Sequence, residues 1–178
     1  MRSMERRDNS EESKERNRNP RNLVLRLSQD HTRFLDKTLP GLRSLAAASG
    51  NLPMARFLEN LSDELLIHFR TEERLVFPLI LSRLEHSSQA IEPALRLACD
   101  HMRDDHRTHM RHLNVLHAFH DQIDSETENG SELCEMLQGF CLELEEHSEL
   151  ENKILFRCWP MVEDELRSFP DRKHGNTD

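Results

Sequence analysis

The sequence contains no tyrosine and no CxxC pair among its four cysteines. Without tyrosine, this chain can supply neither a tyrosyl radical nor a tyrosinate metal ligand. Without CxxC pairs, neither a zinc ribbon nor a thioredoxin-like motif is available. Cys134 and Cys141 are seven residues apart, which on one helix is too far for a disulfide. Reduced thiols of this kind are typical of a cytoplasmic protein.

Long apolar runs are also missing. No apolar stretch reaches about 18 residues, so the sequence predicts no membrane-spanning helix. The stretch 1–20 has no apolar core of the kind found in secretory signals, and its five acidic residues are unusual for a transit peptide. We therefore expect a cytoplasmic protein. Its formal net charge of -9 disfavours binding to nucleic acid or to an anionic membrane.

The sequence gives almost no strand signal, because no run alternates between apolar and polar residues. Instead, amphipathic segments predict helices over about 22–48, 53–85, 93–123 and 131–159. Short loops between long helices predict an all-α, antiparallel, up-down-up-down four-helix bundle spanning residues 21–162. The charged segment 1–20 and the segment 163–178 are predicted to be tails, the first of them disordered. The oligomeric state is not indicated by the sequence.

Local features refine these helices. Pro40 and Pro78 predict kinks in the first and second helices, because proline cannot continue the hydrogen-bond ladder. Ser131 is a suitable N-cap for the fourth helix. A break is expected at Ser49 to Asn51, around Gly50. The apolar positions expected to face inward are Leu23, Leu27, Phe34, Leu35, Phe57, Leu61, Leu65, Phe69, Leu75, Leu95, Met102, Leu113, Leu116, Leu133, Leu137, Phe140, Leu144, Ile154 and Leu155.

Histidine is abundant, with eleven residues in the chain. His68 with Glu72 and His147 with Glu151 form two HxxxE pairs. On a helix, residues four apart share a face, so each pair directs an imidazole and a carboxylate to one point. Nitrogen with carboxylate oxygen is a donor set that suits iron, manganese or zinc.

The position of these residues along the bundle is the stronger indication. In an antiparallel hairpin, residues equidistant from the turn face each other. A turn near Gly50 places His31 opposite the first HxxxE pair, and a turn near Ser88 places His106 opposite the same pair. A turn near position 127 then places His106 opposite the second pair. The sequence thus predicts ligand residues from all four helices at one level.

The turn centres are uncertain by a residue or two, so His101 or His109 remains an alternative to His106. Burying four histidines and two glutamates without a cation would be costly. The residues Glu73, Asp105 and Glu146 adjoin the candidate ligands and are candidates for contacts that support them. His86, His112 and His174 are expected to be exposed to solvent.

At these residues the chain resembles the hemerythrin-like, or HHE, domain family over about residues 23–159. The matching stretches are Asp30-His31, the segment from His68 to Glu73 followed by Phe77-Pro78, Asp105-His106, and the segment from His147 to Glu151 followed by Leu155-Phe156. The resemblance implies two non-haem iron ions in the bundle core, oxo-bridged when oxidised. It also implies that His31, His68, His106 and His147 cap the irons and that Glu72 and Glu151 bridge them.

Two departures bear on function. The oxygen-carrying branch of the family has a further histidine where this chain has Met110, and an aspartate where it has Asn152. The six-ligand pattern resembles bacterial branches linked to nitric oxide stress, repair of iron centres and peroxide decomposition. We therefore expect a protein that binds O2, NO or peroxide in oxidative or nitrosative stress response. The open alternatives are reversible O2 binding or sensing, a catalase-like activity, iron donation, and a metal-free helical interaction module.

Overall fold

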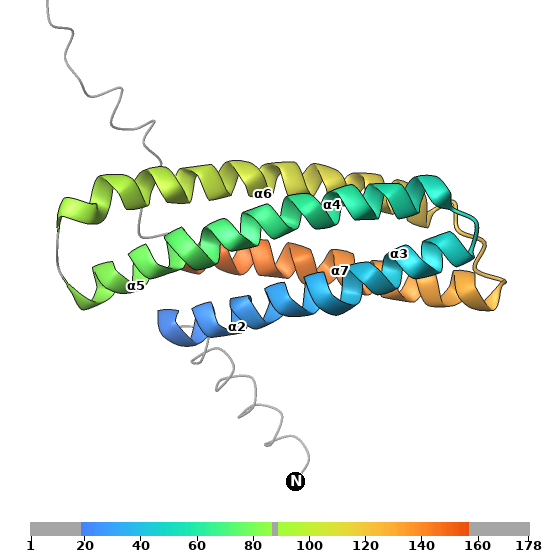
Figure 1. Ribbon diagram of the computed structural model, residues 1–178, viewed down its shortest axis with the longest axis horizontal. Helices are drawn as coiled ribbons and strands as arrows, with labels where there is room; N and C mark the ends of the chain where they lie inside the picture. The colour runs from blue at the N-terminus through green and yellow to red at the C-terminus, as the bar shows by residue number, and fades with distance from the viewer. Residues whose placement is uncertain (1–18, 87–88, 157–178) are drawn as a thin grey trace, which may run out of the picture.

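The computed structural model describes residues 19–86 and 89–156. Figure 1 traces this part of the chain along four helical arms, each running back beside the arm before it. The first arm consists of α2, η1 and α3, and the second consists of α4, η2 and α5. The third is α6, which follows the short η3, and the fourth is α7 with η4. The elements are α2 Pro20–Arg33, η1 Phe34–Thr38, α3 Leu39–Ala48, α4 Leu52–Thr71, η2 Glu72–Val76, α5 Phe77–Glu85, η3 Gln89–Ile91, α6 Glu92–His120, α7 Glu128–Leu150 and η4 Glu151–Leu155. The predicted all-α four-helix bundle is confirmed.

The first two arms begin with asparagine N-caps. The side chains of Asn19 and Asn51 each accept a hydrogen bond from a backbone N–H in the first turn of the helix. Such caps satisfy N–H groups that have no partner within the helix. Because of its cap, the first helix begins at Pro20, slightly earlier than predicted, and the segment 1–18 lies outside the described residues. The predicted break at Gly50 is confirmed, since this residue has a φ of 74°, which glycine adopts without strain.

The fourth arm also begins earlier than predicted. Its N-cap is Thr127, whose hydroxyl accepts a hydrogen bond from the N–H of Gly130 at 3.1 Å, so the prediction of Ser131 was wrong. A side chain on Gly130 would overlap the carbonyl oxygen of Asp124. Glycine therefore lets the loop lie close against the first turn of the helix. The predicted end of this helix near Trp159 and the predicted tail lie outside the described residues.

Three of the arms contain a π-helical turn: Phe34–Thr38, Glu72–Val76 and Glu151–Leu155. The first two turns come directly before the helices that carry Pro40 and Pro78. Proline lacks an N–H and its ring clashes with the carbonyl group four residues earlier, so a wider turn accommodates it. Where the sequence predicts kinks, the structure therefore has π-helical turns.

The π-helical turn at Glu72–Val76 changes which residues face inward. A π turn adds one residue to the helix, so the residues after it are rotated relative to a regular α-helix. Val76 is consequently buried, whereas Leu75 is 49% exposed. The prediction that Leu75 faces the core was wrong for this reason.

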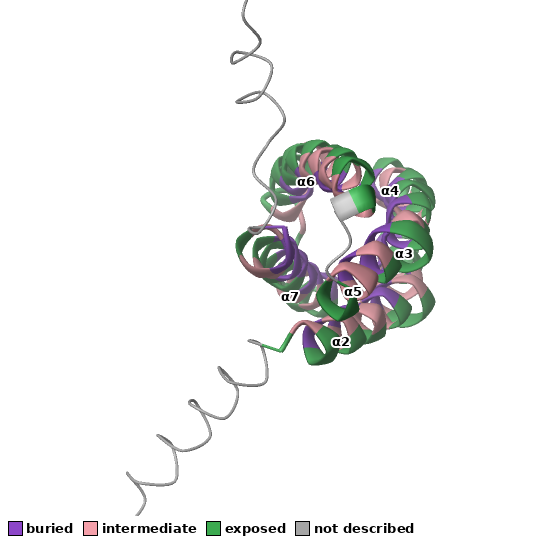
Figure 2. Ribbon diagram, turned by 90° about the vertical axis from the view of Figure 1, so that its left-hand side faces the viewer, coloured by how far each residue is buried: buried purple, intermediate pink, exposed green. Residues whose placement is uncertain are grey.

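The inward faces of the arms form two apolar clusters, and Figure 2 shows the buried residues lining the inside of the bundle. The larger cluster lies toward the end with the turn at Gly50, and it contains Phe34, Leu39, Leu42, Ala46, Met54, Leu58, Leu61, Leu65, Phe69, Leu113, Leu116, Leu133, Leu137, Phe140, Cys141 and Leu144. The smaller cluster contains Leu23, Leu27, Val76, Phe77, Ile80, Leu95, Cys99, Met102, Leu155 and Phe156. Along each arm, the candidate ligands come between the two clusters. A polar layer therefore separates two apolar ends.

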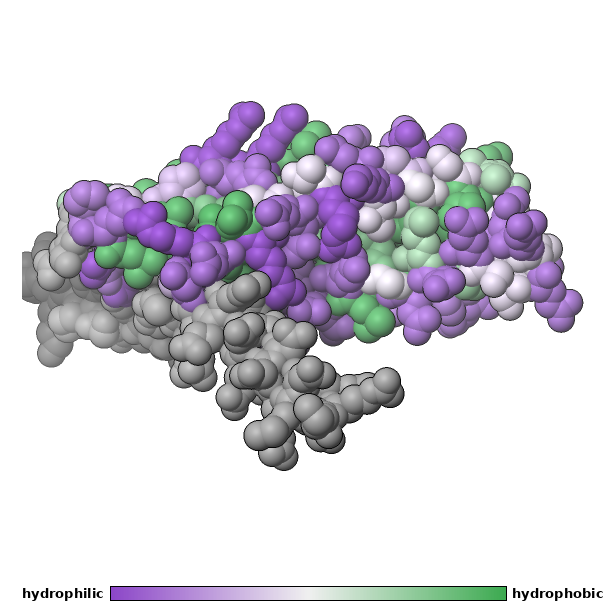
Figure 3. All heavy atoms as spheres, turned by 90° about the horizontal axis from the view of Figure 1, so that it is seen from below, coloured by the Kyte–Doolittle hydropathy of each residue, from purple (hydrophilic) through white to green (hydrophobic). Residues whose placement is uncertain are grey.

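On the face drawn in Figure 3, hydrophilic side chains predominate and smaller apolar areas lie among them. No described helix is long and apolar enough to cross a membrane.

Candidate metal centre

The four arms bring all six candidate ligands to one level of the bundle. These side chains are His31 of α2, His68 of α4, Glu72 at the start of η2, His106 of α6, His147 of α7 and Glu151 at the start of η4. None is more than 3% exposed. They form two groups, each of which can hold a metal ion with ligand atoms within 4.8 Å of one another.

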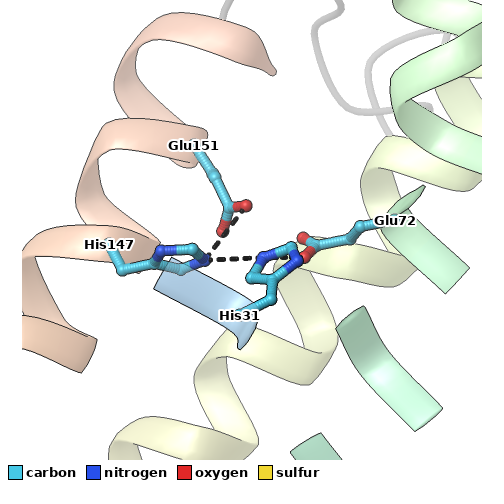
Figure 4. A group of neighbouring side chains, drawn as sticks. All are labelled: His31, Glu72, His147 and Glu151. Atoms are coloured by element: carbon cyan, nitrogen blue, oxygen red, sulfur yellow. Dashed lines mark hydrogen bonds and ion pairs between the residues drawn. The ribbon is translucent and has the colours of Figure 1, made fainter. Parts of the chain in front are cut away.

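The first group, half-site A, consists of His31 and His147 with Glu72 and Glu151. Figure 4 shows the four side chains converging from α2, α7 and the two π-helical turns. The Nε2 atoms of the two histidines lie 3.1 Å apart. His31 Nε2 lies 3.4 Å from Glu72 Oε2, and His147 Nε2 lies 3.4 Å from Glu151 Oε1.

The second group, half-site B, consists of His68 and His106 with the same two glutamates. The Nε2 atoms of these histidines lie 3.2 Å apart. His68 Nε2 lies 3.4 Å from Glu72 Oε1, and His106 Nε2 lies 3.2 Å from Glu151 Oε2. The geometry of half-site B thus closely matches that of half-site A.

The two glutamates are shared between the half-sites in a regular way. Glu72 directs Oε2 toward half-site A and Oε1 toward half-site B. Glu151 directs Oε1 toward half-site A and Oε2 toward half-site B. All four oxygens are buried and have no hydrogen-bond partner among the described residues. A carboxylate in this position can bridge two cations, one on each side.

The outer nitrogens of the histidines contact polar side chains from neighbouring arms. In half-site A, His31 Nδ1 lies 2.9 Å from Glu73 Oε1, and His147 Nδ1 lies 3.7 Å from Asp30 Oδ2. The second distance is within ion-pair range but longer than a hydrogen bond. A histidine that donates through Nδ1 has its Nε2 lone pair free for a metal.

In half-site B, His68 Nδ1 lies 3.2 Å from Asp105 Oδ2, and His106 Nδ1 lies 3.1 Å from Asn152 Oδ1. The supporting contact predicted for Asp105 is present. The contact of Asn152 was missed, because the sequence singles this residue out only as a departure from the family pattern.

Sequence reasoning also identified Glu73 and Glu146 as neighbours of candidate ligands. Glu73 makes the expected contact, whereas Glu146 pairs at the surface with Arg26 at 3.0 Å. Asp30 was missed as a supporting residue. It adjoins His31 in sequence but contacts the histidine of another arm, so only the helix packing reveals its role.

The charges within the centre depend on one another. Burial raises the pKa of Glu151, but His147 and His106 outweigh this effect and hold the pKa well below its usual range. Burial lowers the pKa of His106 and His147, but contacts with the carboxylates, above all Glu151, outweigh it and raise each to about 10. In the metal-free protein, protons on these imidazoles therefore partly neutralise the buried carboxylates.

A comparison with models of known protein families shows the family of this chain. The model of the hemerythrin HHE cation-binding domain family matches residues 22–158. The chain belongs to this family. Searches of curated proteins and of solved structures gave no match. The resemblance seen in the sequence is confirmed at the level of the family, whose members bind cations.

The three candidate histidines on the third helix of this hemerythrin domain lie in different environments. His106 takes part in half-site B, whereas the side chain of His101 is 64% exposed and lies on the outer surface, 4.0 Å from Asp105 Oδ1. His109 is buried, with its ring centroid 4.6 Å from that of His68, but it belongs to neither half-site. Burial, together with the neighbouring His68 and His106, lowers the pKa of His109 to about 3.

The donor atoms of the hemerythrin domain fit a pair of cations. Leaving two carboxylates buried without hydrogen bonds costs on the order of several kcal/mol unless opposite charge compensates them. When each Nδ1 donates, the Nε2 lone pairs face one another within each half-site, and they repel unless a cation or proton lies between them. In the metal-free protein the protons on His106 and His147 reduce both penalties, and a cation in each half-site would replace these protons and compensate the carboxylates.

Proposed function

We propose that this hemerythrin domain holds two non-haem iron ions and binds a small oxidant or diatomic gas in the cytoplasm, in oxidative or nitrosative stress response. The proposed ligands are His31 and His147 for one ion, His68 and His106 for the other, and Glu72 and Glu151 as bridges. The observation that carries the proposal is the division of the carboxylate oxygens, one from each glutamate in each half-site.

The chemical nature of the donors is compatible with iron. Imidazole nitrogen and carboxylate oxygen suit iron, manganese or zinc, and among these the resemblance to the hemerythrin-like family favours iron. Among the described residues, none of the cysteines belongs to either half-site. When bound, the two ions would supply a redox-active centre with coordination positions free for a small ligand.

The protein residues would orient the ligands and exclude water. Glu73 and Asp105 fix two of the imidazole rings through Nδ1 and make Nε2 a stronger donor. The phenyl ring of Phe69 stacks on His31 with a centroid distance of 3.9 Å and an interplanar angle of 9°. These contacts hold the donor atoms in place before any ion binds.

Burial limits what can reach the centre. The six side chains are at most 3% exposed and lie between two apolar clusters. A large metabolite has no room to contact them, whereas O2, NO or hydrogen peroxide is small enough to pass between packed side chains. The proposed ligand class follows from this enclosure.

Anaerobic reconstitution tests the proposal directly. Purified protein is loaded with Fe²⁺, its metal content is measured, and separate samples are exposed to O2, NO and hydrogen peroxide while absorption is recorded. We expect two irons per chain and a spectral change with at least one of the three. A single retained ion, or retention of zinc alone after competition, would contradict the di-iron site.

The three arms of the experiment also separate the possible roles. New absorption bands with NO would support nitrosative defence or sensing, and O2 evolution from peroxide would support a catalase-like activity. A stable, reversible adduct with O2 would instead indicate an oxygen carrier. Iron that is bound but reacts with none of the three would indicate iron storage or donation, and failure to bind iron would favour an interaction module.

A further inference from the structure

The residues around half-site A correspond in position to those around half-site B. The first arm of the bundle corresponds to the third, and the second arm corresponds to the fourth. Phe77 stacks on His31 at 5.9 Å and 16°, and Phe156 stacks on His106 at 5.9 Å and 19°. Each phenylalanine follows the bridging glutamate of its arm at the same spacing. Positions where the correspondence fails therefore identify what distinguishes the half-sites.

The first difference lies three residues after the ligand histidine of the first and third arms. In the first arm this position is Phe34, whose ring contacts that of His147 edge-on at 5.7 Å and 73°. In the third arm it is His109, whose ring contacts that of His68 edge-on at 4.6 Å and 87°. His109 is only 4% exposed, and its Nδ1 has no hydrogen-bond partner among the described residues. A buried imidazole thus replaces a phenyl ring beside half-site B.

The second difference lies directly after the ligand histidine of the second and fourth arms. In the second arm this residue is Phe69, which stacks on His31 in half-site A. In the fourth arm it is the much smaller Ser148, which is buried. At these two positions half-site A therefore has phenyl rings, whereas half-site B has an imidazole and a small hydroxyl side chain.

Further polar side chains lie between the imidazole of His109 and the surface of the bundle. The ring centroid of His112 lies 6.2 Å from that of His109, and His112 Nδ1 lies 3.5 Å from Glu64 Oε2. The side chain of Glu64 is 52% exposed, whereas that of His112 is only 22% exposed and is therefore half-buried rather than exposed to solvent as predicted. We call His109, His112 and Glu64 the histidine row. It extends from half-site B to the surface.

On the corresponding surface of half-site A, the carboxylates are paired with an arginine. Glu143, which matches Glu64, pairs with Arg33, and Arg33 also pairs with Asp30 at 2.8 Å. The guanidinium of Arg33 lies 4.8 Å from the centroid of Phe34. On the side of half-site A the carboxylates of Glu143 and Asp30 are therefore already paired with a guanidinium, whereas Glu64 contacts an imidazole, and a carboxylate beside imidazoles is a donor set that can bind a cation.

We propose that the histidine row is the loading route by which a divalent cation reaches half-site B from solvent. The inference rests on the proposed function only in assuming that the centre binds divalent metal. Glu64 and His112 capture the cation, His109 binds it next, and His68 and His106 receive it. Each step exchanges one imidazole, carboxylate or water ligand for the next, and the proton that His106 carries in the metal-free protein leaves to solvent as the cation binds, so no electron transfer is needed. Half-site A is then filled through half-site B, across the shared carboxylates.

The rate of metal uptake tests this route. The full-length metal-free chain is mixed rapidly with Co²⁺, whose visible absorption changes when nitrogen and carboxylate ligands replace water, and final occupancy is measured by metal analysis. We expect His112→Leu and His109→Leu each to slow uptake about tenfold, equivalent to about 1.4 kcal/mol of barrier. Final occupancy and the final spectrum should match those of the unmodified protein. His117→Leu, an exposed substitution on the same helix, is the matched control and should not slow uptake.

The outcomes separate the route from the metal site itself. Unchanged uptake rates in His112→Leu and in Glu64→Gln, with normal occupancy, would overturn the route and leave the proposed function intact. Reduced final occupancy in His109→Leu with a normal fold would also overturn it, because His109 would then be a ligand. If His109→Leu does not fold, slow uptake in both His112→Leu and Glu64→Gln still supports the route. An unmodified protein that binds no metal would refute both proposals.

Discussion

Half-sites A and B offer the same donor atoms at nearly the same distances, but different residues support those donors. In half-site A, the outer nitrogens of both histidines face carboxylates, those of Glu73 and Asp30. In half-site B, one faces the carboxylate of Asp105 and the other faces the neutral amide of Asn152. A carboxylate partner makes an imidazole a more basic ligand than an amide does. Half-site A should therefore bind its cation more tightly, although half-site B has the more polar route to solvent.

This difference indicates that the ligand residues alone do not determine the affinity and the uptake rate of a binuclear metal centre. Affinity depends on the residues that contact the outer face of each imidazole, and the uptake rate depends on the residues between the centre and solvent. In this protein the two properties favour different half-sites. Substituting a ligand that the half-sites share should therefore have a larger effect than substituting a residue that differs between them.

The largest effect is expected from Glu72→Ala, which removes a ligand of both half-sites at once. We expect loss of both ions in metal analysis. We also expect loss of the stabilisation that metal provides, which is about 4 kcal/mol for a ligand at a thousand times its Kd. For a chain of this size that corresponds to roughly 10 °C in Tm by calorimetry with metal present. Glu59→Ala, an exposed change on α4, is the control and should retain both ions.

An intermediate effect is expected from removing one histidine on either side. At equilibrium, His147→Ala should empty half-site A and leave half-site B occupied. His106→Ala should do the reverse, although half-site A should then fill slowly, because its cation enters through half-site B. Metal analysis is expected to give one ion per chain in each variant, and the two variants should differ in their Co²⁺ spectra. Loss of both ions from either variant would show that neither half-site binds metal alone.

A smaller effect is expected from Asn152→Asp, which makes the partners of half-site B resemble those of half-site A. Supporting residues of this kind typically change metal affinity by about tenfold or more, so we expect tighter binding in half-site B by about that factor. Competition with a chelator would measure it. Glu73→Gln is the reciprocal change and should weaken half-site A. If both variants bind metal as the unmodified protein does, the supporting contacts do not explain any difference between the half-sites.

The smallest effect is expected from His101→Ala. This side chain is largely exposed and lies outside both half-sites. Its removal should leave metal content unchanged and alter the free energy of unfolding, measured with urea, by no more than about 0.5 kcal/mol. A clear loss of metal from His101→Ala would mean that His106 is not the ligand on the third helix.

Much of the fold and of the arrangement around the centre could be predicted from the sequence. Apolar spacing gave four helices, and short loops made distance from the turns a reliable guide to which residues face each other. This reasoning preferred His106 to His101, and the structure brings His106 together with His31, His68 and His147. That these residues bind metal remains a prediction.

Other features could not be predicted, because they depend on packing between arms. The contacts of Asp30 and Asn152 join residues on different helices, and neither residue stands at a recognisable spacing from its partner. The π-helical turns shift which residues face inward, so Leu75 was misplaced. The early start of the fourth helix at Thr127 depends on how closely the loop approaches Gly130. Local sequence patterns do not report such effects.

The shared use of Glu151 has a consequence for when the centre can form. Half-site A joins His31 to His147, residues 116 positions apart, and half-site B also requires Glu151, although its histidines lie on the second and third arms. During synthesis, three completed arms could already pack against one another, but neither half-site would be complete. Contacts this distant in sequence form late, because a long loop must first close. The polar layer would therefore remain open to solvent until the last arm is added, and complete metal binding would mark the end of folding.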